Sequence, residues 1–431
     1  MSASLAAFMA WLSAGASTFT RPSFSLFVEL VCSWVLCPGR RTVTNMLSML
    51  APRPRRAHDA YHRFLRAGVW DMTQLWFFLV TKLVGALVPD GVLPLDLDDT
   101  LFHKSGRKVD GAGVFRDAVR STGRRVVYAL GLNLVVLTLR VQPPWGGEPL
   151  GLPVGVRLHR KKSFTTLELA EQLINQIAEW LPSRSFALCC DGAYASLVGS
   201  DLPRTTVTSR IRRDAAIYDQ PRSRRKGQRG RPALKGKRLP MPEVLAKKTK
   251  RGWRRVQVNM RGRLVERLVL TRDVLWYQVS KGKPIRLVVV RDPDGVEHDD
   301  FFITTAITAQ PADVATQYAG RWSIEDTFRN VKQHLGGEDP QTWKGDGPSR
   351  AASLSLWIYS VVWAWYILAH GATKTWATRP WYPGKTVASF ADALAALRRV
   401  LWRRAISTGS ASQRHMRKTI GVLIDALARA A

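Results

Sequence analysis

Acidic residues stand at the ends of two apolar runs that have the pattern of buried strands. Val92 to Asp98 alternates, so Asp96 and Asp98 share one face of the predicted strand. Phe186 to Asp191 is mostly apolar until its final aspartate. A carboxylate at the end of a buried strand is costly unless it is paired or binds a metal ion. Because carboxylates at two strand ends of one sheet can converge, Asp98 and Asp191 form a candidate site.

Other interpretations of these aspartates stay open. Asp99 is the register alternative to Asp98, and the sequence Asp98, Asp99, Thr100 also suits a turn or a helix cap. Asp191 precedes Gly192, which permits a sharp exit from the sheet, so a cap is an alternative there too. The pair is therefore more informative than either member.

A third acid lies among basic residues further along the chain. On a helix at about 100° per residue, four polar positions fall within roughly 60° of arc. They are Tyr318, Arg321, Glu325 and Lys332. The neighbouring apolar stripe consists of Ile324, Phe328, Val331 and Leu335. The apolar stripe would pack and the polar stripe would present an acid between two bases, so replacing Arg321 or Lys332 should leave the fold intact. The alternative is a helix with ordinary surface charge pairs.

A mixed sheet is needed to hold the two aspartates. The predicted strands of the core are Val92–Asp98, Arg125–Leu132, Leu134–Val141 and Phe186–Asp191, with a helix at Thr166–Trp180. This order gives an α/β core with a mixed sheet. Later strand-like runs predict a β-rich insertion at Arg254–Val258, Leu264–Leu270, Val274–Val279 and Ile285–Val290, before a last strand at Phe301–Thr305.

The positive charge of the chain is concentrated in one segment. The formal net charge is +32, and Arg204 to Arg263 contains 21 lysines and arginines against three acids. Nucleic acid is the natural partner of such a chain, although ribosome-like and membrane-surface proteins are also basic. The glycines and prolines of Arg222–Arg238 predict a mobile loop, or alternatively a solvated tract. The candidate DNA-binding residues of this loop are Arg224, Arg225, Lys226, Arg229 and Arg231.

Four cysteines and the first residues favour a cytoplasmic protein. Cys189 and Cys190 are adjacent and Cys32 and Cys37 have four residues between them, which suits neither a disulfide framework nor a zinc site. The first lysine or arginine is Arg21, so the apolar start lacks the charged region of a secretory signal. We expect four reduced core cysteines.

Membrane insertion and ATP binding are both disfavoured. The apolar segments Leu75–Val88 and Leu354–His370 approach membrane length, but the first contains Lys82 and the second is slightly short of about 20 residues. Both are predicted to be buried helices. Gly384 begins a sequence like the end of a P-loop, but Arg379 stands where its first glycine should be.

The polar stripe has a recognisable spacing. Y-x2-R-x3-E-x6-K resembles the signature of a large group of bacterial insertion-sequence DDE transposases, and it is filled here by Tyr318, Arg321, Glu325 and Lys332. The sequences around Asp98 and Asp191 resemble that family's first and second acidic motifs. The resemblance spans roughly Leu93 to Lys332, including the β-rich insertion.

The resemblance implies a ribonuclease H-like fold in which Asp98, Asp191 and Glu325 hold two Mg²⁺ ions, with Mn²⁺ as a substitute. Hard divalent ions prefer oxygen ligands, and two of them can activate the attacking oxygen and stabilise the leaving one. Arg321 and Lys332 would hold flanking phosphates, with Tyr318 as a phosphate or sugar contact.

The function implied by the resemblance is cut-and-paste transposition: cleavage at the transposon end, then attack of the freed 3′-hydroxyl on target DNA. The partners would be terminal inverted repeats, target DNA and a second copy of the chain in a synaptic homodimer, at the bacterial nucleoid. The family often stacks a flipped base on a tryptophan of the insertion; Trp253 and Trp276 are candidates, with core packing as the alternative. The rival functions are a non-catalytic DNA-binding protein and a structure-selective nuclease.

The sequence predicts five parts in order. They are a helical DNA-binding region (1–90), the first half of the catalytic core (91–203), the basic loop and β-rich insertion (204–300), the second half of the core (301–345) and a helical region (346–431). The expected fold class is α/β, with helical regions at both ends.

Overall fold

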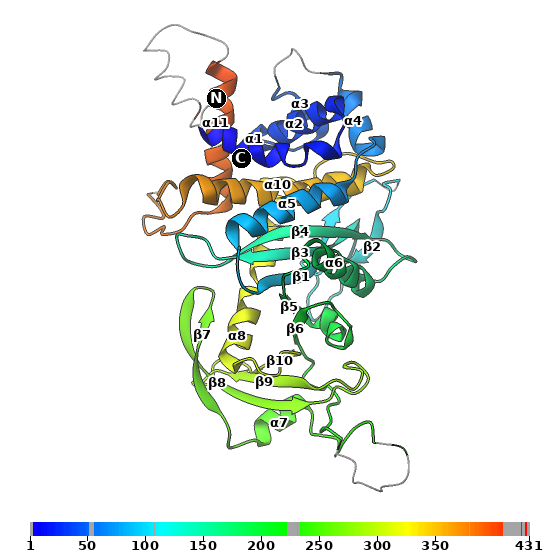
Figure 1. Cartoon of the computed structure of the whole chain (residues 1–431), viewed down its shortest axis with the longest axis vertical. Coiled ribbons are helices and arrows are strands. Elements are labelled where there is room, and N and C mark those ends of the chain that lie inside the picture. The colour runs from blue at the N-terminus through cyan, green and yellow to red at the C-terminus, as the bar shows by residue number, and fades with distance from the viewer. Residues whose placement is uncertain are drawn as a thin grey trace.

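A mixed sheet runs through the middle of the molecule, between a helical layer and the β-rich insertion (Figure 1). The computed structural model describes residues 3–50, 56–106, 108–221, 231, 233–378, 380–407, 424 and 427–428. The described residues near both ends of the chain belong to the helical layer. The insertion forms the opposite end of the molecule (Figure 1).

The helical layer begins with several helices, three of which start at a capping side chain. They are α1 (Ala3–Ser13), η1 (Ala16–Thr18), α2 (Arg21–Leu36), α3 (Val43–Leu47), α4 (His58–Ala67) and α5 (Met72–Leu87). Thr20 caps α2, Thr42 caps α3 and Asp71 caps α5, each by accepting a backbone N–H of the first turn. Their apolar faces pack together, and their buried residues are continuous with the core that covers the sheet.

Helix α10 (Gly347–His370) connects this layer to the sheet. It packs against β4 on one side and against α1, α4, α5 and α11 (Phe390–Ser407) on others. Among the described helices it is the one long and apolar enough to cross a membrane, and 94% of its most apolar window is buried inside the protein. An apolar helix covered in this way is a core helix, as the sequence predicts for this segment.

The core sheet has the strand order and directions of a ribonuclease H-like fold. Its strands are β1 (Leu93–His103), β2 (Gly113–Arg116), β3 (Tyr128–Val141), β4 (Leu150–His159), β5 (Phe186–Cys190) and β6 (Thr205–Arg210). The order is β4-β3-β1-β5-β6; β3 is antiparallel to β1 and β4, whereas β1, β5 and β6 are parallel. Helix α6 (Thr166–Trp180) crosses between β4 and β5, and η2 (Gly192–Gly199) follows β5. The predicted α/β class with a mixed sheet is confirmed.

Several core strands differ from the prediction, which lacks β2, β4 and β6 and divides β3 in two. The predicted runs Arg125–Leu132 and Leu134–Val141 are one strand, β3, which continues through Asn133. Strand β4 is absent from the prediction because Pro153 and its glycines resemble a loop. Its pairing with β3 shifts register at this point, which is where a strand tolerates proline.

The insertion extends the same sheet. Strand β10 (Asp300–Thr304) pairs with β6 and continues to β9 (Ile285–Arg291), β8 (Arg263–Val274) and β7 (Arg254–Met260), all antiparallel. Helix α7 (Pro242–Lys248) precedes these strands, and α8 (Pro311–Gly320) lies on them over a small core of its own. Ten strands among the described residues thus form one sheet.

The predicted strand Val274–Val279 is wrong. Leu275 makes an isolated bridge to Tyr218, and the chain then turns, with Val279 and Ser280 both donating to the carbonyl of Trp276. A turn satisfies these backbone groups locally, which an apolar pattern by itself does not reveal.

Candidate active site

Asp98 and Asp191 lie side by side on neighbouring parallel strands. Leu97 of β1 and Cys190 of β5 are the last paired residues of these two strands, and Asp98 and Asp191 are the residues that follow them. Strand β5 ends at Cys190, whereas β1 continues to His103 along β3. The predicted end of the first strand at Asp98 is therefore wrong: Asp98 is in mid-strand, at the level where β5 ends. Adjacent parallel strands are about 4.8 Å apart, which brings the two carboxylates close together.

The surroundings of Asp98 disfavour its charge. Burial raises the pKa of Asp98 to about 7; Arg321 opposes this rise and the neighbouring Asp191 adds to it. Asp191 is held by its own turn, since its Oδ1 accepts the backbone N–H of Ala193 at 2.8 Å. Burial thus leaves Asp98 short of positive charge, a condition typical of functional sites.

The two other aspartates of β1 have partners of their own. Asp96 is fully buried and forms an ion pair with Arg140. Asp99, the register alternative, accepts a hydrogen bond from the Tyr194 hydroxyl at 3.1 Å. Of the three aspartates in this strand, Asp98 is the one that bonds Arg321, and Arg321 in turn bonds Glu325.

Arg321 joins Asp98 to Glu325. Its Nη1 donates to Asp98 Oδ2 at 2.8 Å and its Nη2 donates to Glu325 Oε1 at 2.9 Å. Although burial opposes the guanidinium charge, its acidic neighbours raise the pKa of Arg321. Burial also raises the pKa of Glu325, against the effect of Arg321. The guanidinium is thus the cation that compensates two acids from distant parts of the chain.

The helix that presents these groups is broken where the prediction has it continuous. Helix α8 ends at Gly320 and α9 (Ser323–His334) begins after Arg321 and Trp322. At the junction the backbone N–H of Ile324 donates to the carbonyl of Arg321 at 3.1 Å. This bond spans three residues, as in a 3₁₀ turn, which is tighter than an α-helical turn. The break leaves Arg321 and Glu325 one turn apart, so the predicted pairing of these two positions persists.

The polar stripe is less exposed than the sequence predicts. Tyr318 is buried in the small core under α8, where its ring lies 4.4 Å from that of Phe302. Arg321 is also buried. Lys332 donates to the carbonyl of Leu101 at 2.8 Å, beyond Asp98 along β1. The expectation of a polar face open to solvent is wrong at these positions, because the sheet covers them.

The donor set suits a hard divalent cation. Asp98 and Asp191 offer carboxylate oxygens at adjacent positions, and Glu325 offers a third on the other side of Arg321. Within the part of the chain that the structure describes, no three His, Cys, Asp or Glu side chains surround one point closely enough to hold an ion. The structure thus brings the two aspartates together and separates them from Glu325 by the Arg321 guanidinium.

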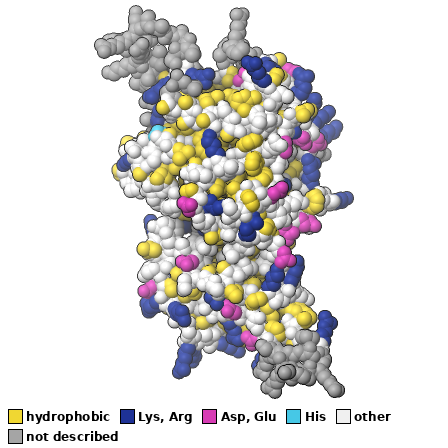
Figure 2. Space-filling model, viewed as in Figure 1, with side chains coloured by type: hydrophobic (Ala, Val, Ile, Leu, Met, Phe, Trp, Pro, Cys, Tyr) yellow, Lys and Arg dark blue, Asp and Glu magenta, His cyan; other side chains and the backbone are white. Residues whose placement is uncertain are grey.

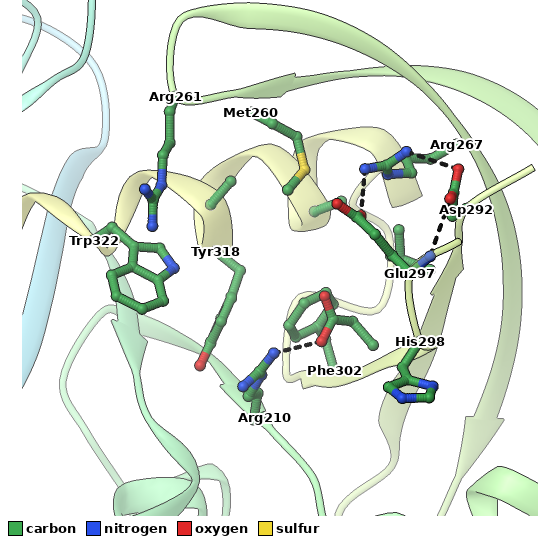
Figure 3. A pocket seen from close by; sticks show the side chains of 14 residues that line it. Arg210, Met260, Arg261, Arg267, Asp292, Glu297, His298, Phe302, Tyr318 and Trp322 are labelled. Carbon is green, nitrogen blue, oxygen red and sulfur yellow. Dashed lines mark hydrogen bonds and ion pairs between the residues drawn. The ribbon is translucent and has the colours of Figure 1, made fainter. Parts of the chain in front are cut away.

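A pocket of about 180 Å³ lies between α8 and the insertion and reaches Trp322, the neighbour of Arg321 in the chain; none of the three candidate carboxylates lines it (Figure 3). Tyr318 and Trp322 line it from the α8–α9 junction, Arg210 from β6, and Arg261 from the turn between β7 and β8. The Arg261 guanidinium lies 4.5 Å from the centre of the Trp322 ring, and that of Arg210 lies 5.8 Å from the Tyr318 ring. Three acids, Asp292, Glu297 and Asp300, also line the pocket and pair with Arg267 and Arg210. The contact of Arg261 with the Trp322 ring suits a phosphate with an attached base.

Arg261 and Trp322 are residues that the sequence interpretation missed. Arg261 and Gly262 form a two-residue hairpin turn with φ values of 54° and 80°. An arginine with positive φ is uncommon and is often found at functional positions. The signal in the sequence was an Arg-Gly pair between two strand-like runs, which is a hairpin signature.

The tryptophans proposed for base stacking lie elsewhere. Trp253 and Trp276 are partly buried and pack against the main core, and Trp253 donates to the carbonyl of Thr249 at 2.8 Å. Trp322, next to Arg321, is 43% exposed. The exposed indole beside the candidate site therefore comes from the helix junction and not from the insertion.

The basic loop is only partly described. Arg224, Arg225, Lys226 and Arg229 lie outside the described residues, and Arg231 is exposed. In Figure 2, Lys and Arg side chains project from the end of the molecule where the insertion lies, with acidic side chains among them. The insertion thus presents projecting basic side chains among acidic ones.

Comparison with protein families agrees with this arrangement. The family described as DDE superfamily endonuclease matches residues 18–283, more than half of the chain. The match includes Asp98 and Asp191 and ends before Glu325. No curated protein matches the chain. The extent of the family match shows that the chain belongs to the DDE superfamily endonucleases.

Proposed function

We propose that this protein is a cut-and-paste transposase of a bacterial insertion sequence. Its family makes DNA the substrate and metal-dependent cleavage the general activity. The observation that supports the finer proposal is the contact of Arg321 with both Asp98 and Glu325, beside Asp191, because it gathers the acidic motifs and the Y-R-E-K spacing at one place.

In this proposal Asp98, Asp191 and Glu325 hold the catalytic cations, Mg²⁺ or in its place Mn²⁺. When bound, two such ions lower the pKa of an attacking water or 3′-hydroxyl and stabilise the leaving oxygen. Arg321 pairs with two of the carboxylates in the free protein, and in this proposal it pairs with a DNA phosphate once cations compensate them. Tyr318 contacts a phosphate or sugar, and Lys332 contacts a phosphate, of the same DNA strand.

The rest of the chain grips DNA. The basic loop, including Arg231, neutralises phosphates, and the pocket at Arg210, Arg261 and Trp322 holds the terminal nucleotides. We assign residues 1–90 to recognition of the terminal repeats, 204–300 to the insertion that grips them, and 346–431 to the helical layer. A homodimer at the bacterial nucleoid would pair two transposon ends.

The experiment uses the full-length protein and a labelled duplex with the element's own terminus. The wild type should nick the duplex with Mg²⁺ or Mn²⁺ and join the freed 3′ end to target DNA. Glu325→Gln should bind the terminus normally and lose both reactions, since the amide keeps the shape and removes the charge. Asp326→Asn, on the same helix and paired with Arg329 at the surface, is the matched control.

Each rival function has its own outcome in this assay. Nicking without strand transfer would identify a structure-selective nuclease. Specific binding without metal-dependent nicking would identify a DNA-binding protein derived from a transposase. Normal cleavage by Glu325→Gln would remove Glu325 from the catalytic set.

A further inference from the structure

A buried polar cluster lies next to the candidate carboxylates and has no part in the chemistry proposed above. It consists of Asp96 on β1, Arg140 on β3, Cys189 on β5 and Ser323 in the first turn of α9. Asp96 is completely buried, and 10% of the Arg140 side chain is exposed. We call this set the Arg140 cluster.

The contacts within the Arg140 cluster connect four elements. Asp96 Oδ2 accepts from Arg140 Nε at 3.0 Å and from Ser323 Oγ at 3.1 Å, and Asp96 Oδ1 is paired with Arg140 Nη2. The thiol of Cys189 faces the same guanidinium. A buried carboxylate is tolerated only when it is compensated in this way, so these partners are fixed relative to one another.

Two glycines show how closely the α8–α9 junction is seated on this cluster. A Cβ at Gly320 would lie 2.9 Å from Arg140 Nη1, and a Cβ at Gly151 on β4 would lie 3.0 Å from the carbonyl of Ser323. Thr327 Oγ1 donates to the carbonyl of Gly151 at 2.6 Å. The start of α9 is therefore held against β1, β3 and β4 without space for a side chain between them.

The spacing along the chain links the cluster to the active site. Asp96, Cys189 and Ser323 each precede a candidate carboxylate by two residues: Asp98, Asp191 and Glu325 respectively. On β1, Asp96 and Asp98 point to the same face of the sheet. Cys189 lies on β5 just before Asp191, and Ser323 lies in the same first turn of α9 as Glu325. A shift of the cluster would therefore move the backbone segments that carry the three carboxylates.

We propose that Arg140, together with Asp96 and Ser323, is a positioning group that sets the separation of the three carboxylates and so determines their affinity for divalent cations. The inference rests on the proposed function, because it takes Asp98, Asp191 and Glu325 as the ligands. Partners that orient metal ligands from behind typically contribute 10–100-fold to metal affinity.

The test measures Mn²⁺ binding to the full-length protein by the loss of the free-ion electron paramagnetic resonance signal, alongside thermal unfolding. Ser323→Ala should weaken Mn²⁺ binding about tenfold, and Arg140→Met should weaken it more. Arg140→Lys keeps the charge without the forked geometry and should recover part of the loss. Thr138→Val is the matched control, because this buried hydroxyl bonds the backbone oxygen of Asp96 and not its carboxylate.

The outcomes separate the inference from the proposed function. If Ser323→Ala and Arg140→Met bind Mn²⁺ as the wild type does and only unfold more easily, the cluster is structural and the inference is overturned. If Arg140→Met does not fold, Ser323→Ala decides the question by itself. If Mn²⁺ binding to the wild type does not depend on Asp98, the proposed function fails, and the inference fails with it.

Discussion

The catalytic core and the insertion share one sheet but use charge in opposite ways. In the core, β3 is buried without interruption from Gly131 to Leu139, and the charged groups that enter it are ion-paired. In the insertion, most residues of β7 and β8 are exposed or half-buried, and ion pairs such as Arg255–Glu266 lie at the surface, although Arg267 and Asp292 form a buried pair. Burying charged side chains in the core lowers the stability of the fold unless they are paired. Most charged side chains of the insertion stay in water, where a partner can reach them.

Two ion pairs illustrate the difference. The side chain of Arg321 is 7% exposed and that of its partner Asp98 is 18% exposed, whereas the values for Arg255 and Glu266 in the insertion are 68% and 41%. Water screens the second pair strongly and the first much less. An arginine–carboxylate pair should therefore contribute much more to the free energy of unfolding in the core than in the insertion.

The largest expected effect is that of Asp98→Asn. Metal-dependent nicking should fall by about a thousandfold or more, because a ligand charge is lost from the catalytic site. Stability without metal should not fall. Burial raises the pKa of Asp98 from 3.8 to about 7, so the carboxylate costs folding free energy above its unfolded pKa, and the cost grows as pH rises towards 7.

The check is thermal unfolding of the metal-free protein at pH 4 and pH 7, with nicking measured in parallel. Asp98→Asn should gain stability relative to wild type as pH rises through this interval. A variant that is less stable than wild type at pH 7 would show that Asp98 belongs to the structure of the core and not to a site that binds cations.

The next effect is that of Arg321→Ala. Removal of the guanidinium leaves two carboxylates without their cation, and breaking a buried pair costs about 3–5 kcal/mol. Glu325 is 37% exposed, so we expect about 2–3 kcal/mol, measured by urea unfolding without metal. Saturating Mn²⁺ should restore part of the loss. An unchanged free energy of unfolding would support the solvent-exposed stripe that the sequence predicted.

A smaller effect, on DNA binding alone, is expected in the insertion. Replacing Arg224, Arg225, Lys226, Arg229 and Arg231 with alanine should weaken binding to any duplex and lower the slope of its salt dependence by up to about 4.5, since each of five phosphate contacts adds about 0.9 to the slope. Fluorescence anisotropy at several salt concentrations measures both. A loss restricted to one DNA sequence would indicate contacts with bases, and an unchanged slope would mean that the loop does not touch phosphates.

The smallest effect is that of Glu266→Gln, which removes the surface pair with Arg255. The free energy of unfolding should change by about 0–1 kcal/mol, because exposed pairs contribute little. DNA affinity should rise slightly, since an acid is removed from a basic surface. If Glu266→Gln lowered the free energy of unfolding as much as Arg321→Ala, ion pairs in the insertion would contribute as much to stability as those in the core, and the comparison would be wrong.

Several elements could be predicted because their causes are local. Helix α6 has the predicted bounds, Thr166–Trp180, since Thr165 and Glu168 form a capping box and its apolar residues recur at helical spacing. Strands β5, β7, β9 and β10 are close to their predicted positions for the same kind of reason. The i, i+4 relation of Arg321 and Glu325 also follows from sequence spacing alone.

Other features depend on contacts between distant segments. Sequence patterns predict that Asp98 ends a strand, but pairing with β3 extends β1 to His103, and only the register with β5 places Asp191 beside Asp98. Burial of Arg321 and Tyr318 likewise requires the sheet beneath α8 and α9. Periodicity distinguishes polar from apolar faces, but it does not show which polar face another element covers.

The amino-acid sequence by itself determined the residue types, the spacing of the acidic motifs and the excess of positive charge, and hence the chemistry available to this protein. Tertiary structure decided which acid meets which cation: Asp96 pairs with Arg140, and Asp98 shares Arg321 with Glu325. The physical reason is that ion pairing acts over a few ångströms, so its partners are chosen by the packing of strands and helices that are far apart in the chain.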